Sequence, residues 1–194
     1  MSCWPCQRRR DVAAEGPAEI AEAYEEMCKG YDRQTGAAQV SAQELQAWLQ
    51  DPDQQVVIFD VRGKNEHWVS SLPGARLLVP TAAGMAKAMS GVGRLSFETG
   101  IPSADTIPPD AKVVCHCTAG LRSGYACAAL QGEWKKKGVN RSVLNLHGGI
   151  ISWVNAGAQV VDPRTGESAA TVHTFGQKWQ PYVQAEGVEA VLSP

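Results

Sequence analysis

The sequence lacks any long apolar run, and this absence limits the kind of protein it can encode. The longest runs, residues 56–59 and 126–130, suit a buried core and fall far short of the ~18 residues that cross a bilayer. An excess of positive charge is also missing, because 18 Lys and Arg stand against 20 Asp and Glu. With a net charge of -2, the chain lacks the excess of positive charge that is typical of proteins that bind nucleic acid. With 44% hydrophobic residues, the 194-residue chain is expected to form a soluble globular domain with extensions.

The six cysteines do not have the distribution of a disulfide scaffold. Cys3, Cys6 and Cys28 are expected outside the core, and the N-terminus lacks the apolar segment of a signal peptide. Cys115 and Cys117 lack the spacing of an ordinary zinc site and no second cluster matches them, so we expect no metal. These features favour an intracellular, reducing compartment, with the cytoplasm preferred over an organelle or a membrane-associated location.

The pattern divides the chain into a central domain and two extensions. Residues 1–37 form an N-terminal extension that is expected to be partly disordered or helical. Residues 38–161 form the domain, which contains the regular apolar pattern. Residues 162–194 form a C-terminal extension, in which the sequence predicts only a strand or helix near residues 179–190.

Within the central domain, apolar strand segments alternate with helical segments. A capping box formed by Ser41 and Glu44 precedes the first helix. Such alternation is typical of an α/β protein with an open parallel sheet and helices on both faces. The expected strands are residues 56–59, 76–79, 110–116 and 143–146, and the expected helices are residues 45–49, 66–69, 81–89, 123–137 and 149–155.

The most informative segment is residues 113–123, where an apolar strand leads into a cysteine loop and then into a helix. This order places the Cys117 thiol at the floor of a ring of backbone N–H groups and at the positive end of a helix. Both features favour a thiolate, and both favour an anionic group attached to it. Gly120 supplies the unusual backbone angles that a tight concave loop needs. The sequence therefore predicts sulfur chemistry with Cys117 as the nucleophile.

Three separated segments resemble the rhodanese-like sulfurtransferases. Residues 58–66 and the turn at residues 72–75 are similar to the family's Asp-Val-Arg-x-x-x-Glu segment and Pro-Gly-Ala turn. Ser70-Ser71 stand where the family usually has Gly-His before that turn. Residues 117–123 resemble the active-site loop of single-domain members, and residues 146–157 resemble the closing Leu-x-Gly-Gly segment. Three such segments in the right order make the resemblance specific.

The resemblance implies a rhodanese-like open parallel sheet and a sulfurtransferase that needs no cofactor. Cys117 is expected to take a sulfane sulfur as a persulfide from a small anionic donor, such as thiosulfate or a persulfide. It then passes the sulfur to a thiol or cyanide acceptor, with a protein persulfide as a further candidate partner. By resemblance, the catalytic residues are Cys117 and Arg122, the substrate-binding loop is Thr118, Ala119, Gly120, Leu121 and Ser123, and the supporting residues are Asp60, Arg62 and Glu66.

The role of Arg122 has two interpretations that the residues leave open. In one, it attracts an anionic donor and stabilises the thiolate. In the other, it pins the loop through an ion pair with Glu66 or Asp60. For Asp60, Arg62 and Glu66 themselves we favour a structural, pocket-shaping network, because an arginine at a strand end beside carboxylates is commonly paired.

Two other functions stay open alongside the sulfurtransferase. A non-catalytic rhodanese-like interaction module fits the same fold, although it has no need of an intact Cys117, Gly120 and Arg122. A cysteine-dependent phosphatase or arsenate reductase is disfavoured, because those enzymes have a longer loop between cysteine and arginine than the four residues found here. Cys115 and Cys127 are expected to be core residues, with resolution of a persulfide as the alternative.

The N-terminal extension carries two features of its own. The pattern predicts a helix over residues 18–29, ended by Gly30. Cys3 and Cys6 lie beside the basic residues 8–10. This arrangement fits either a disordered end, which we prefer, or an acylated membrane anchor.

Overall fold

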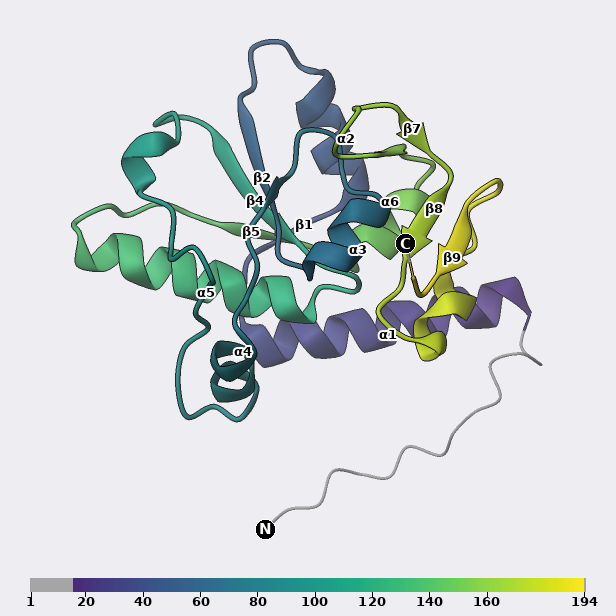
Figure 1. The fold of residues 1–194 in the computed structure, drawn as a ribbon, viewed down its shortest axis with the longest axis horizontal. Coiled ribbons are helices and arrows are strands. Elements are labelled where there is room, and N and C mark those ends of the chain that lie inside the picture. Colours follow the sequence, from purple (N-terminus) through teal and green to yellow (C-terminus); the bar gives the residue numbers. More distant parts are fainter. Residues whose placement is uncertain (1–15, 194) are drawn as a thin grey trace.

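A parallel β-sheet forms the centre of the protein (Figure 1). The structure is a computed structural model and describes residues 16–193. The strands of the sheet are β1 (Gln39–Val40), β2 (Val56–Asp60), β3 (Arg76–Leu77), β4 (Lys112–His116) and β5 (Leu144–Leu146). They lie in the order β1-β5-β4-β2-β3, and every neighbouring pair is parallel. The predicted open parallel sheet is therefore confirmed.

Helices cover both faces of this sheet, as predicted. They are α1 (Pro17–Thr35), α2 (Ala42–Gln50), α3 (Lys64–Val69), α4 (Ala82–Met89), α5 (Leu121–Lys136) and α6 (Gly149–Asn155). Side chains of β2 alternate between the faces: Val57 and Phe59 pack with α4 and α5, whereas Ile58 packs with α2 and α6. Because both faces are buried, the central strands are almost continuously apolar in sequence.

Local sequence signals set several of the element boundaries. Ser41 caps α2 as predicted, since its hydroxyl accepts from the Glu44 N–H at 3.1 Å and the Glu44 carboxylate accepts from the Ser41 N–H at 3.0 Å. Helix α5 begins at Leu121, earlier than the predicted residue 123, because Gly120 has a φ of 94° and caps the helix. A short 3-10 helix, η2 (Ala104–Thr106), interrupts the long connection between α4 and β4.

The N-terminal segment differs from its prediction in two ways. Helix α1 continues through Gly30 and ends only at Gly36, whose φ of 63° is left-handed. A glycine inside a helix costs about 1 kcal/mol, and the contacts that α1 makes with the domain outweigh this cost. Cys28, expected outside the core, is completely buried beside Tyr24. Helix periodicity groups Cys28 with Tyr24 and Met27 on one apolar face, but it does not show what covers that face, because the covering surface comes from distant parts of the chain.

The C-terminal segment holds more structure than the single element predicted near residues 179–190. It contains β7 (Ser168–Ala169), β8 (Thr171–His173), the 3-10 helix η3 (Gln177–Tyr182) and β9 (Glu189–Val191), and it follows β6 (Val160–Val161), which ends the predicted domain. Strands β6 and β7 are antiparallel, and β8 and β9 are parallel. Strands this short leave no periodic pattern in a sequence. Segment η3 lies against α1 (Figure 1), so the two extensions meet.

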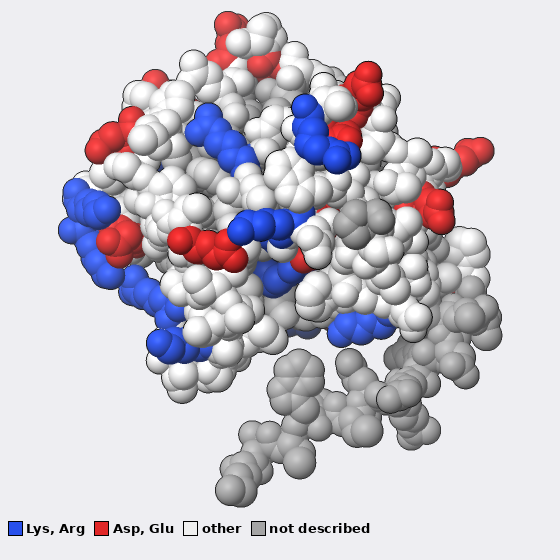
Figure 2. Space-filling model, viewed as in Figure 1, with Lys and Arg blue, Asp and Glu red and all other residues white. Residues whose placement is uncertain are grey.

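Two observations concern the surface. Figure 2 shows acidic and basic side chains interspersed over the face in view. Within residues 16–193, none of the helices combines the length and the apolar character that a membrane crossing needs.

The predictions for Cys3, Cys6 and residues 8–10 lie outside the described residues, and the extension boundaries at 37 and 162 stay predictions.

Candidate active site

Cys117 lies at the carboxyl edge of the central sheet, between the end of β4 and the start of α5. Open α/β sheets place their sites at this edge. The Cys117 Sγ accepts hydrogen bonds from the Gly120 N–H at 3.2 Å and from the Ser123 hydroxyl at 3.3 Å. Both donors stabilise negative charge on the sulfur, and so does the N-terminal end of α5. The residue is only 2% exposed, which puts the thiol at the bottom of the loop.

The closing segment predicted from the Gly-Gly pair supports this loop from behind. Gly149 has a φ of 56°, and a Cβ added there would lie 2.3 Å from the Cys117 carbonyl oxygen. The Ile150 N–H donates to the same carbonyl at 2.9 Å. Only glycine permits this approach, so α6 can hold the backbone of Cys117 directly. Two of the three segments that carry the family resemblance are thereby in contact.

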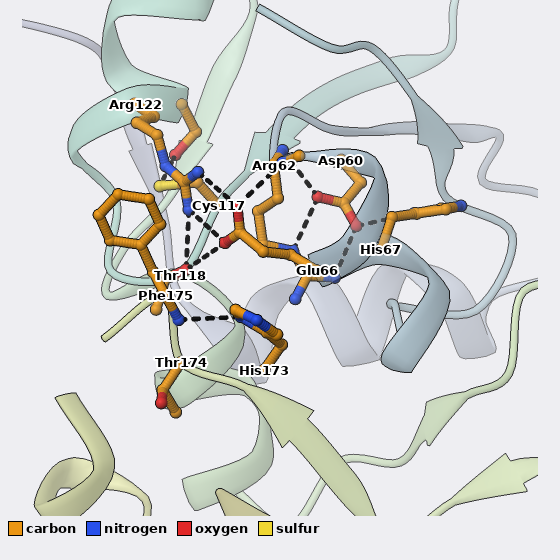
Figure 3. A network of polar contacts seen from close by, with 12 residues as sticks. Asp60, Arg62, Glu66, His67, Cys117, Thr118, Arg122, His173, Thr174 and Phe175 are labelled. Atoms are coloured by element: carbon orange, nitrogen blue, oxygen red, sulfur yellow. Dashed lines mark hydrogen bonds and ion pairs between the residues drawn. The ribbon is translucent and has the colours of Figure 1, made fainter. Parts of the chain in front are cut away.

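Arg122 forms a two-pronged ion pair with Glu66 (Figure 3). Both N–O distances are 2.7 Å, and the Arg122 Nη2 also donates to the Thr118 hydroxyl at 2.9 Å. Burial alone raises the pKa of Glu66, but hydrogen bonding and charge from Arg122 bring it below its ordinary value. Of the two interpretations of Arg122, this geometry realises the ion pair with Glu66. The Thr118 hydroxyl is engaged in this pair and does not reach the sulfur.

A second, fully buried network surrounds Asp60 behind the loop (Figure 3). Its carboxylate accepts from the Arg62 Nε and Nη2 at 2.9 and 2.7 Å, from the His67 Nδ1 at 2.9 Å and from the Ser71 hydroxyl at 2.7 Å. Burial raises the pKa of Asp60, but Arg62 and the nearby His116 bring it well below its ordinary value. Burial also lowers the pKa of His116 to about 4. Ser71, which departs from the family pattern, thus donates to the same carboxylate.

The two extensions cover the Cys117 loop, a contact that the sequence did not predict. Ala119 of the loop lies in one apolar cluster with Tyr24 and Cys28 of α1 and Trp179 of η3. The Cys28 thiol donates to the Ala119 carbonyl across 3.8 Å. The Phe175 ring lies over the Arg122 guanidinium, 4.7 Å from ring centroid to Cζ. Aromatic side chains in both extensions are the one sequence signal that could have indicated this contact.

The cysteines of the flanking strand and helix, Cys115 of β4 and Cys127 of α5, occupy the core as expected. Cys115 and Cys127 are completely buried, and both are free thiols. Burial raises the pKa of the Cys115 thiol well above its ordinary value, and the neighbouring Cys127 adds to this. A thiol held neutral in this way is a poor nucleophile.

His147 joins α1 to the segment that follows β5. Its Nδ1 lies 2.7 Å from the Asp32 carboxylate and its Nε2 lies 2.9 Å from the Glu25 carboxylate. Burial alone lowers the pKa of His147, but hydrogen bonds and charge from Glu25 and Asp32 raise it above the ordinary value of 6.5. The pKa of Glu25 is lowered from 4.5, chiefly by its hydrogen bond to His147.

These shifts predict that α1 docks most stably in mildly acidic solution. The contribution of His147 is fully present below pH 6.5 and is lost as pH rises through its raised pKa, whereas that of Glu25 is present above pH 4.5. Between mildly acidic and alkaline pH, we expect the unfolding free energy of the wild type to fall by about 0.5–1 kcal/mol more than that of His147→Gln. The difference is small because His147 and Glu25 are partly exposed to water. Urea unfolding at both pH values measures this. Identical pH dependence in the two proteins would contradict it.

The described residues thus form an α/β domain in which the Cys117 thiol lies in a tight loop at the N-terminus of a helix. A family model for the rhodanese-like domain matches residues 41–156. The chain belongs to the rhodanese-like family.

Individual relatives match this chain over only part of their own length. A sulfurtransferase of Allochromatium vinosum is 47% identical over 57 residues, which are 29% of this chain and 49% of that protein. A probable adenylyltransferase/sulfurtransferase MoeZ of Mycobacterium tuberculosis is 30% identical over 118 residues, 59% of this chain and 24% of that one. The crystal structure of a thiosulfate sulfurtransferase from Pseudomonas aeruginosa matches with a TM-score of 0.48 and 21% identity, over 82% of this chain and 26% of its own. This chain therefore spans half or less of each of these proteins.

Proposed function

We propose that the protein is a sulfurtransferase that carries a sulfane sulfur as a persulfide on Cys117. The observation that carries this proposal is the position of the Cys117 Sγ, which accepts from the Gly120 N–H and the Ser123 hydroxyl at the start of α5. Donors aimed at one sulfur stabilise both a thiolate and a persulfide anion attached to it. Membership of the rhodanese-like family and two relatives named as sulfurtransferases support the same conclusion.

The proposed reaction has two half-reactions. The Cys117 thiolate attacks the outer sulfur of thiosulfate, a new S–S bond forms, and sulfite leaves with the electron pair of the broken bond. Cyanide or a thiolate then attacks the outer sulfur of the persulfide, and the electron pair of that S–S bond returns to Cys117. The products are thiocyanate or a new persulfide, and the enzyme regains its thiolate. No oxidant or reductant is consumed.

Arg122 has a positioning role in this scheme. Its guanidinium is held by Glu66, so the loop keeps one conformation through both half-reactions. The ion pair also cancels much of the positive charge that would attract a donor from a distance. Asp60 and Arg62 support this arrangement from the buried side and do not touch the sulfur.

Steady-state kinetics with thiosulfate and cyanide test the proposal. A persulfide that is formed before the acceptor binds predicts parallel lines in double-reciprocal plots, because sulfite leaves before cyanide enters. Glutathione persulfide serves as a second donor. Intersecting lines would contradict the persulfide intermediate. No thiocyanate from either donor would contradict the proposal as a whole and favour the non-catalytic interaction module.

A further inference from the structure

The reacting loop is closed from one side by an aromatic cluster. Tyr24 of α1 lies 5.0 Å from Tyr182, and Tyr31 of α1 lies 6.3 Å from Trp179, measured between ring centroids. Together with Cys28 these side chains pack on Ala119. All of residues 117–120 are buried. A substrate must therefore reach the Cys117 sulfur from another side of the loop.

On the Arg122 side of the loop, the side chain of Phe175 lies over the guanidinium. Its ring lies 4.7 Å from the Arg122 guanidinium, and Figure 3 shows it on the same side of the ion pair as the Cys117 sulfur. The phenylalanine is 61% exposed, so its outer surface faces solvent while its inner surface covers the arginine. A partly exposed ring in this position can be displaced without disrupting the core.

The backbone holds Phe175 in this place at a cost. Its φ is 66°, and among the described residues no other non-glycine residue has a positive φ. A bulky side chain rarely adopts this conformation, and such strain concentrates at functional sites. The chain beside it is anchored, because Thr174 is completely buried and its N–H donates to the Val191 carbonyl at 3.0 Å.

His173 fixes the strained residue directly. The Phe175 N–H donates to the His173 Nδ1 at 3.0 Å, and the His173 Nε2 lies 2.9 Å from the Leu192 carbonyl oxygen. Both bonds form together only when Nε2 carries the proton and Nδ1 accepts. His173 therefore acts as a neutral hydrogen-bonding link between β8, Phe175 and the end of β9.

We propose that Phe175 is a specificity-determining residue that admits small sulfur donors and acceptors to Cys117 and obstructs bulky thiols. His173 is the positioning residue that holds it over the site. The acceptor half of this inference rests on the proposed sulfur transfer. Thiosulfate and cyanide pass beside the ring, whereas a tripeptide thiol such as glutathione requires the ring to move away from Arg122.

Acceptor selectivity is the first test. With thiosulfate as donor, Phe175→Ala is expected to raise kcat/KM for glutathione about two- to fivefold, a change of the size of an exposed cation–π contact. The value for cyanide should change less than about twofold, since cyanide already passes the ring. Leu49→Ala, an exposed apolar residue on α2, is the control and should change neither value. Equal effects on both acceptors, or no effect, would overturn the inference.

Chemical labelling tests access without relying on sulfur transfer. Cys117 is alkylated with iodoacetamide or with a bulky maleimide, and the extent at its own peptide is followed by mass spectrometry. In Phe175→Ala the rate with the maleimide should rise about two- to fivefold more than the rate with iodoacetamide, because the same contact is lost. If the wild type accepts no sulfur from any donor but this selectivity is seen, the proposed function fails and the access role stands. If loading occurs but the two rates change equally, the access role fails.

Two substitutions at His173 test whether this residue positions the Phe175 ring, because both leave the ring itself in place. In His173→Asn the side-chain oxygen can replace Nδ1 as the acceptor for the Phe175 N–H, so wild-type acceptor selectivity is expected. In His173→Leu the acceptor is gone, and we expect a rise in glutathione use like that of Phe175→Ala. Urea unfolding confirms that each variant is folded. If His173→Leu keeps wild-type selectivity while folded, the positioning role is wrong.

Discussion

Replacing Cys117 by serine is expected to lower the rate of sulfur transfer at least about a thousandfold. A serine hydroxyl stays protonated at neutral pH and cannot carry the outer sulfur as a persulfide. The substitution keeps the size of the side chain, and the Gly120 N–H and Ser123 hydroxyl can donate to the serine oxygen in place of sulfur. The loop should therefore keep its conformation, and the loss should lie in kcat. Thiocyanate formation from thiosulfate and cyanide measures it.

The matched control is Cys127→Ala, which removes a buried thiol from α5, the helix that begins directly after the Cys117 loop. Because Cys127 takes no part in the proposed reaction, this variant should keep the wild-type rate once folding is confirmed. A serine variant at 117 that retains a substantial fraction of the rate, or an alanine variant at 127 that loses it, would show that another cysteine carries the sulfur.

The second large effect is on stability. We expect Arg62→Met to lower the free energy of unfolding by about 3–5 kcal/mol, because it leaves the Asp60 carboxylate buried without its cation. Asp60 and Arg62 are both completely buried, and the pair is held by two side-chain hydrogen bonds of 2.9 and 2.7 Å. Methionine fills much of the arginine volume, so the loss reports the uncompensated charge more than a cavity. Urea unfolding measures the difference.

The chain contains its own control for this experiment. Asp162 and Arg164 repeat the same arrangement on the surface, with Nε and Nη2 donating to the carboxylate at 3.0 and 2.7 Å. Their side chains are 26% and 65% exposed, so water replaces the lost partner and Arg164→Met should change stability little. In the double variant Asp60→Asn with Arg62→Met, part of the stability should return because the buried charge is gone. Equal effects at the two arginines would contradict the burial argument.

The sheet and the cysteine loop could be predicted from sequence because their signals are local. Residues 56–59 and 113–115 are apolar on both faces, which is typical of buried parallel strands, and Ser41 with Glu44 forms the cap that its spacing predicts. The small-residue loop after β4 likewise places Cys117 where the structure has it. In each case the interacting residues are close in the chain or belong to one repeating pattern.

The packing of α1 and η3 over the Cys117 loop could not be predicted, because these contacts join distant parts of the chain. Cys28 and Ala119 are 91 positions apart, and neither has a neighbour pattern that indicates the other. Gly30 has the local signature of a helix end, yet α1 continues because its far end packs on α5. His67 and Ser71 bond to Asp60 through single side chains, for which no spacing rule exists.

The most direct test of a persulfide on Cys117 is the intact mass of the purified protein after exposure to a sulfane donor. Thiosulfate and glutathione persulfide are used separately, and cyanide is added afterwards. The proposed mechanism predicts that the wild type gains the mass of one sulfur atom, that cyanide removes it as thiocyanate, and that Cys117→Ser gains nothing. No gain from either donor, or an equal gain in Cys117→Ser, would contradict it.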